Sequence, residues 1–228
     1  MNTLHKLQKA SVYIWRKHYK LIDLINRNPL LYDFYLASNS SEELQDRFQQ
    51  FHYLNETLID NAPISYLEFG VFKGQSIGHW LKINRNPDSR FYGFDTFTGL
   101  PEDWSVNMKK GAFNLDGEIP NLGDERAELI SGMFQDTLRP FLIGFKRNEK
   151  MVVHLDADLY SSTMFVLSQL DSILRKGDII VFDEFGDLNG EFKAYLDYTS
   201  AFKRTLKPVS RVLLSSSWIV DKVAFSLE

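Results

Sequence analysis

From residue 63 onward, short apolar runs alternate with segments of helical spacing, a pattern typical of βα units on a parallel sheet. Parallel strands need a crossover helix between them, so this part of the chain is expected to form a doubly wound α/β domain. The expected parallel strands span 65–69, 90–94, 127–131, 151–155 and 178–182. Two later runs, 210–214 and 224–227, leave no room for a crossover helix and predict an antiparallel hairpin at the sheet edge.

Residues 1–62 show apolar residues at helical spacing and no strand alternation, which predicts an N-terminal helical extension before a domain at 63–228. We expect three helices there. A turn at 26–29 separates the first two, and the polar residues 38–41 resemble the N-cap of a third that begins at Glu42. Aromatic side chains in this extension also favour self-association of the protein.

Residues 100–125 are rich in Gly, Pro, Asn and Asp and have little periodicity. Connections of this length are usually functional or mobile, so we expect a lid loop near the active site. A disordered surface insertion is the alternative.

Composition excludes several classes of protein and site. The chain has 228 residues, 44% of them hydrophobic, which is enough for a buried core. Its formal net charge of -4 gives no pull toward nucleic acid. There is no cysteine, so any metal must be held by oxygen or imidazole. Neither a signal peptide nor a membrane span is expected, and the cytoplasm is the expected location.

The turn after the first expected strand has the features of a ligand-binding turn. Residues 66–76 read YLEFGVFKGQS and place Glu68 at the strand end. Gly70 and Gly74 let the backbone approach a ligand closely, and Ser76 lies at the start of the next helix. Val71 lies in the same turn. No G-x-G-x-x-G motif is present, and Glu68 would repel a pyrophosphate but attract an ammonium or sulfonium group.

A second acid completes this prediction. Asp95 ends the next strand, 27 positions after Glu68, where an acid can bind the hydroxyls of a ribose. A nucleoside that also carries a cation indicates S-adenosylmethionine. An ordinary structural glycine turn is the alternative.

Two pairs of acids follow neighbouring strands later in the chain. Asp156 and Asp158 follow one strand, and Asp183 and Glu184 follow the next. Carboxylates that meet at one rim repel each other unless a cation or proton lies among them. With only oxygen ligands, Mg²⁺ or Ca²⁺ fits better than zinc. Helix capping is the alternative role for these acids. His154 is expected to be a hydrogen-bonded core histidine.

The chain resembles the macrocin O-methyltransferase family, which methylates sugar hydroxyls in antibiotic and related glycoside pathways. The stretches that carry the resemblance are YLEFGVFKGQS (66–76), FYGFDTFTGLP (91–101), SGMFQDTLRPF (131–141), VHLDADLYSST (153–163) and GDIIVFDEF (177–185). The resemblance implies a Rossmann-like sheet of seven strands in the order 3-2-1-4-5-7-6. It also implies S-adenosylmethionine-dependent, Mg²⁺-dependent methylation of a small-molecule sugar or glycoside.

The resemblance further implies a role for each acid. Asp156, Asp183 and Glu184 match the metal ligands of the family, and Asp158 matches its general base. The family usually has two aspartates where this chain has Asp183-Glu184, so the third ligand departs from the pattern. Metal coordination that makes a sugar hydroxyl more acidic, with a carboxylate to accept the proton, would address the poor reactivity of that hydroxyl.

Three rival functions stay open at the level of sequence. A nucleotide-dependent oxidoreductase would use a similar sheet, but the missing glycine motif speaks against it. A non-catalytic module could bind adenosine ligands, or a partner through the N-terminal helices. A catechol-type O-methyltransferase would need the same metal and differ only in its lid.

Overall fold

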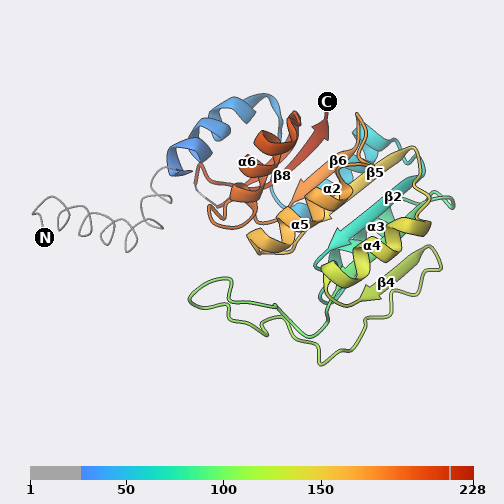
Figure 1. The fold of residues 1–228 in the computed structure, drawn as a ribbon. Helices are drawn as coiled ribbons and strands as arrows, with labels where there is room; N and C mark the ends of the chain where they lie inside the picture. The colour runs from blue at the N-terminus through green and yellow to red at the C-terminus, as the bar shows by residue number, and fades with distance from the viewer. Residues whose placement is uncertain (1–26, 216) are drawn as a thin grey trace, which may run out of the picture.

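The computed structural model describes residues 27–215 and 217–228 and shows an α/β fold around one mixed sheet (Figure 1). The sheet has eight strands in the order β1-β7-β8-β6-β5-β2-β3-β4. The strands are β1 (Glu42–Leu44), β2 (Ile64–Phe69), β3 (Arg90–Asp95), β4 (Ala127–Ser131), β5 (Lys150–Leu155), β6 (Ile179–Phe182), β7 (Leu206–Leu213) and β8 (Val220–Leu227). The helices that cover it are α2 (Arg47–Tyr53), α3 (Gln75–Ile83), α4 (Phe134–Gly144), α5 (Tyr160–Leu170) and α6 (Glu191–Phe202).

The seven predicted strands are all present and lie in the expected order, with β7 and β8 as an antiparallel pair. The predicted count of seven is wrong, because β1 adds an eighth strand that pairs parallel with β7. Both hairpin strands also begin four residues earlier than predicted, at Leu206 and Val220. The early part of β7 contains Pro208, which lies beside a β-bulge, and a proline weakens the strand pattern in the sequence.

The N-terminal part differs from the expected helices. Residues 27–37 are helical, so the turn predicted at 26–29 does not separate helices at the residues described there. Residues 38–40 form a 3-10 turn, and the predicted first residues of the third helix, 42–44, form the strand β1 instead. The helix α2 starts five residues later than expected, at Arg47, because Asp46 caps it by accepting a hydrogen bond from the backbone N–H of Gln49. The first predicted helix lies outside the described residues.

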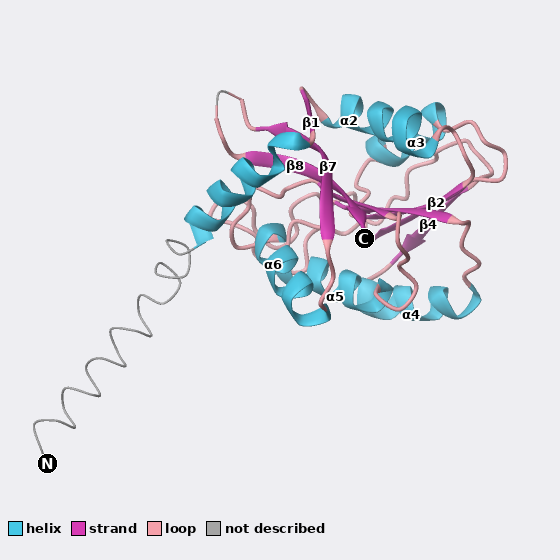
Figure 2. Cartoon of the chain, turned by 90° about the horizontal axis from the view of Figure 1, so that it is seen from above, coloured by secondary structure: helices cyan, strands magenta, loops and turns pink. Residues whose placement is uncertain are grey.

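Helices cover both faces of the sheet, as a view from above shows (Figure 2). α4, α5 and α6 lie on one face, and α2 and α3 lie on the other. Alternate residues of β2 separate the two cores: Leu67 and Phe69 belong to the core under α4–α6, whereas Ile64 and Tyr66 pack with Trp80 of α3. Within the described residues, no helix is long and apolar enough to cross a membrane.

The central strands continue their hydrogen bonding one residue past their ends. The N–H of Gly70 donates to the carbonyl of Phe94, and the N–H of Asp156 donates to that of Phe69, both at 2.9 Å. The N–H of Asp183 likewise donates to the carbonyl of Leu155 at 2.9 Å. The residues that follow β2, β5 and β6 are therefore fixed side by side at the carboxyl rim of the sheet.

The long connection from β3 to β4 leaves the sheet at this same rim and extends away from it (Figure 1). It is not without internal order. Leu100 exchanges backbone hydrogen bonds with residues 111 and 112, each at 2.9 Å, which folds the connection back on itself.

The opposite rim of the sheet contains a buried ion pair that yields a stability prediction. Asp178 receives two hydrogen bonds of 2.7 Å from Arg147, and it also accepts from the backbone N–H groups of Met151 and Arg175. Asp178→Ala would leave Arg147 without its buried partner. We expect a loss of about 3–5 kcal/mol in the free energy of unfolding, measured by urea denaturation. The exposed Asp88→Ala is the control, and equal stability of the two variants would contradict this account.

Candidate active site

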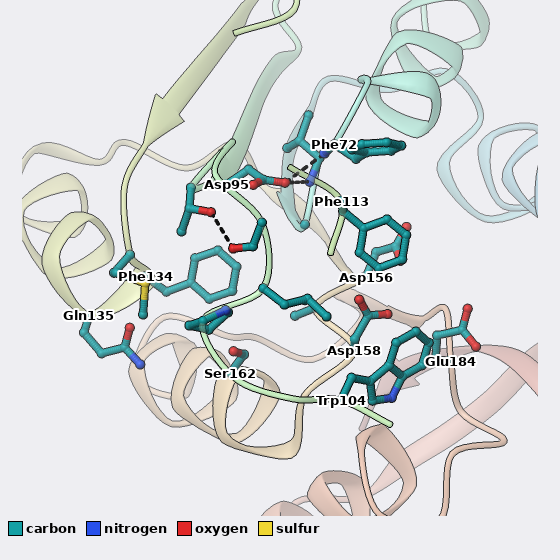
Figure 3. A pocket seen from close by; sticks show the side chains of 18 of the residues that line it. Phe72, Asp95, Trp104, Phe113, Phe134, Gln135, Asp156, Asp158, Ser162 and Glu184 are labelled. Carbon is teal, nitrogen blue, oxygen red and sulfur yellow. Dashed lines mark hydrogen bonds between the residues drawn. The ribbon is translucent and has the colours of Figure 1, made fainter. Parts of the chain in front are cut away.

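A cavity of about 290 Å³ opens at the carboxyl rim of the sheet (Figure 3). Each of the five sequence stretches that carry the family resemblance supplies lining residues, although the stretches span residues 66–185. In Figure 3, Asp95 and Phe134 lie toward one end of the cavity, and Asp158, Trp104 and Glu184 gather toward the other. The cavity therefore joins a turn that suits a cofactor to a group of acids.

The glycine turn is packed directly against the strand end that carries the acids. Gly70 has φ +94°, and a Cβ placed on it would lie 1.8 Å from the carbonyl oxygen of Asp156. Only glycine fits there without a shift of backbone. Gly70 and Val71 both line the cavity, as predicted residues of the cofactor site.

Asp95 organises the turns around it. One carboxylate oxygen accepts hydrogen bonds from the backbone N–H groups of Val71 and Phe72, both at 2.8 Å. The other accepts from the N–H of Phe97 at 2.7 Å. Asp95 thus joins the glycine turn to the start of the long loop, and its carboxylate lies at the cavity wall.

Three other predicted cofactor residues do not line this cavity. Glu68 is buried on the face covered by α2 and α3, where it accepts a short hydrogen bond from the hydroxyl of Tyr66. Gly74 is the N-cap of α3 and has a left-handed conformation, with φ +73°. Ser76 is buried, and its hydroxyl accepts from Arg47 at 3.4 Å. These three residues belong to the structure that supports the turn and do not line the cavity.

Three of the four predicted acids face the cavity: Asp156, Asp158 and Glu184. Burial, followed by the charge of neighbouring Asp156, raises the pKa of Asp158 to about 8. Burial likewise raises the pKa of Glu184 to about 7. Burial and the neighbouring carboxylate of Asp183 raise the pKa of Asp156. These acids resist ionisation together, which is the condition that a bound cation would relieve.

Asp183 lies behind this group and is surrounded by cationic groups. It is 1% exposed, and its Oδ2 lies 2.7 Å from a guanidinium nitrogen of Arg47 and 3.2 Å from Nζ of Lys222. Burial opposes its ionisation, but His154, Lys222 and Arg47 hold the pKa of Asp183 below its usual range. Its other oxygen, Oδ1, lies 3.5 Å from Nε2 of His154.

Arg47 and Lys222 were not predicted as site residues. Arg47 comes from the first turn of α2 and contacts both Asp156 and Asp183, at 3.2 and 2.7 Å. Lys222 comes from β8, the antiparallel neighbour of β6. Neither lies in a motif or beside one. Only the packing of distant segments brings them to the acids.

His154 behaves as the sequence indicated. His154 is fully buried, and its Nδ1 lies 2.9 Å from the hydroxyl of Tyr66, which confirms the prediction of a hydrogen-bonded core histidine. It nevertheless belongs to a group with Asp156 and Asp183 whose ligand atoms all lie within 4.8 Å of one another.

Two hydrogen bonds attach the long loop to the protein at the acid end of the cavity. The indole N–H of Trp104 donates to Asp187 at 2.8 Å, and the hydroxyl of Ser161 donates to Glu102 at 2.6 Å. Trp104 lines the cavity together with Phe113 of the same loop. The expected lid segment therefore forms part of the cavity wall and places aromatic rings beside the acids.

Comparisons with solved structures agree with this fold. CalS11, a calicheamicin methyltransferase, is 23% identical, with a TM-score of 0.61 over 78% of this chain and 77% of that one. The O-methyltransferase NovP is 21% identical, with a TM-score of 0.59 over 79% and 78% of the two chains. A structure of CmcI with Mg and SAM is 17% identical, with a TM-score of 0.51 over 81% of this chain and 72% of that one.

Sequence comparison gives the family. A 4'-O-methyltransferase of Streptomyces olivaceus, which acts on a dimethoxy-rhamnosyl tetracenomycin, is 26% identical over 160 residues. That match covers 61% of this chain and 60% of the relative's length. The model of the macrocin-O-methyltransferase family matches residues 43–218, which include every lining residue of the cavity. The chain belongs to the macrocin-O-methyltransferase family.

Proposed function

We propose that the protein transfers a methyl group from S-adenosylmethionine to a hydroxyl of a sugar or glycoside, with the help of Mg²⁺. The observation that carries this proposal is the cavity itself, where a glycine turn and a strand-end acid adjoin a group of carboxylates. Family membership supports a sugar as the acceptor, as do the tetracenomycin glycoside of the Streptomyces olivaceus relative and the TDP-rhamnose named for CalS11.

The glycine-turn end of the cavity suits the cofactor. The carboxylate of Asp95 lies where ribose hydroxyls would be bound, and Met133 and Phe134 provide an apolar wall for a purine. Adenosine held at this end would leave the sulfonium toward the acid end of the cavity, where Asp158 lies.

The acid group fits a hard divalent cation. Oxygen atoms of Asp156 and Asp183 lie within 4.8 Å of each other, and Glu184 offers a further carboxylate at the same rim. Asp156, Asp183 and Glu184 would hold the ion, and carboxylate oxygens are the ligands that Mg²⁺ prefers. When bound, Mg²⁺ supplies positive charge that makes a nearby sugar hydroxyl more acidic.

Asp158 would accept the proton of that hydroxyl. It lines the cavity between the cofactor turn and Trp104, and it has a left-handed backbone with φ 59° that points to a fixed position. The O–H proton would pass to the Asp158 carboxylate while the oxygen bonds to the methyl carbon and the sulfur–methyl bond breaks, which would give the methyl ether and S-adenosylhomocysteine.

The acceptor would enter beside the long loop. Trp104 and Phe113 present aromatic faces at the acid end of the cavity, and such faces stack on sugar rings. We therefore assign residues 100–125 as an acceptor-binding lid. Four points stay predictions from the sequence: the domain boundary at residue 62, the cytoplasmic location, the absence of a nucleic-acid partner, and self-association.

The first test concerns the cofactor turn. Gly70→Ala would force a Cβ against the Asp156 carbonyl, so we expect binding of S-adenosylhomocysteine to weaken at least about tenfold in calorimetry. Gly177→Ala is the matched control, because Gly177 has a similar φ of +88° but an added Cβ meets nothing within 4 Å. Undiminished binding by the Gly70 variant would remove this turn from the cofactor site.

The second test concerns the base. Asp158→Asn should leave affinity for S-adenosylhomocysteine unchanged and lower kcat about a hundredfold or more, because the amide cannot accept the proton. Turnover is measured as S-adenosylhomocysteine released with a panel of rhamnosides and nucleotide-linked rhamnose. Asp60→Asn is the control, since Asp60 is exposed and shares the left-handed conformation, with φ 54°. An unchanged rate in the Asp158 variant would exclude it as the base.

The third test concerns the metal. Treatment with a chelator should lower turnover about a hundredfold and leave binding of S-adenosylhomocysteine in place, since Gly70, Val71 and Asp95, which would hold the cofactor, are not ligands of the ion. Added Mg²⁺ should restore the rate. Full activity after chelation, with metal content checked by elemental analysis, would refute the metal requirement.

A further inference from the structure

Arg47 lies where the proposed metal ion would be held. Its guanidinium contacts Asp156 Oδ2 at 3.2 Å through one nitrogen and Asp183 Oδ2 at 2.7 Å through another. These are two of the carboxylates assigned to the ion. Among the described residues, no other lysine or arginine nitrogen lies within 4.0 Å of the Asp156 carboxylate.

The position of Arg47 on its own helix does not account for this contact. Arg47 is the first residue of α2, where the helix dipole disfavours a positive charge. The side chain is directed instead to the rim of the sheet, where it also reaches the hydroxyl of Ser76. The acids therefore determine where this guanidinium lies.

Buried polar atoms beside Arg47 remain without a conventional hydrogen bond. Oδ1 of Asp183 and Nε2 of His154 are both buried and face each other at 3.5 Å. Asp183 is almost fully buried, so an unpaired oxygen there is costly. The site therefore contains buried atoms that could bind a cation and that Arg47 does not contact.

We propose that Arg47 is an internal cation that balances Asp156 and Asp183 in the metal-free protein, and that Mg²⁺ must displace it to bind. The proposal rests on the Mg²⁺-dependent function argued above. A guanidinium and a divalent ion that contact the same two carboxylates would repel each other strongly, so only one of them can occupy the site at a time.

The structure gives Arg47 a way out of the site. Its side chain is 30% exposed and lines the open cavity, whereas its partner Asp183 is 1% exposed. Rotation about the side-chain bonds of Arg47 would move the guanidinium toward solvent without a shift of α2. Lys222, by contrast, is 12% exposed and also donates to the backbone carbonyl of Asp183, so it stays in place.

Displacement predicts a gain of metal affinity when Arg47 is removed. If the guanidinium fills the site nine-tenths of the time, its loss tightens the apparent Kd for Mg²⁺ about tenfold. We therefore expect Arg47→Ala to bind Mg²⁺ about tenfold more tightly than the wild-type protein, measured by calorimetry and by competition with Mn²⁺ in electron paramagnetic resonance. Arg47→Lys, which keeps the charge but not the two-pronged contact, should fall between them.

Thermal unfolding supplies a second readout. Without metal, Arg47→Ala should melt at a lower temperature than the wild-type protein, because Asp156 and Asp183 lose their balancing charge. With saturating Mg²⁺ the variant should gain more in Tm than the wild-type protein does. Arg139→Ala is the control, since exposed Arg139 on α4 pairs with Gln169 and not with the acids.

The outcomes distinguish a failure of the Arg47 displacement proposal from a failure of the proposed Mg²⁺ requirement. Binding of S-adenosylhomocysteine shows that each variant is folded. If the wild-type protein binds Mg²⁺ and Arg47→Ala binds it no more tightly, the displacement proposal is wrong and the metal requirement stands. If neither protein binds Mg²⁺ while both bind S-adenosylhomocysteine, the metal requirement fails and displacement fails with it.

Discussion

The repulsion among carboxylates at the ends of β5 and β6 is the constraint that the site must satisfy. Asp156 and Asp183 follow adjacent parallel strands whose hydrogen bonding continues past their ends, so the backbone gives them no room to separate. Cationic groups from α2, β5 and β8 surround the buried member of the pair. The helix and the antiparallel edge of the sheet therefore serve the site as well as the core.

The strand pattern could be predicted because its signal is local. Each predicted strand is a short apolar run, and the central strands β2, β5 and β6 are buried on both faces. The strand β1 gave no such signal. It consists of three residues, two of them glutamates, and it forms only because β7 offers an open edge across the fold. Pairing between segments so distant in sequence cannot be read from either segment alone.

The site was predicted to the extent that it follows strand ends. Asp95, Asp156 and Asp158 all line the cavity because the carboxyl ends of parallel strands meet at one rim. Glu68 lies elsewhere because it is still in the strand, in phase with Tyr66, and so points to the face under α2 and α3. Arg47 could not be predicted, because its role depends on where α2 is packed.

Gly70 packs directly against the carbonyl of Asp156, so no side chain lies between the backbone of the cofactor turn and the backbone that carries the acids. A shift of either backbone segment toward the other would therefore produce a clash. The two ends of the cavity are therefore joined through backbone packing, whereas the far end of the long loop is attached through the side chains of Trp104 and Glu102. Substitutions in this loop can therefore reshape the cavity wall with the least effect on the sheet.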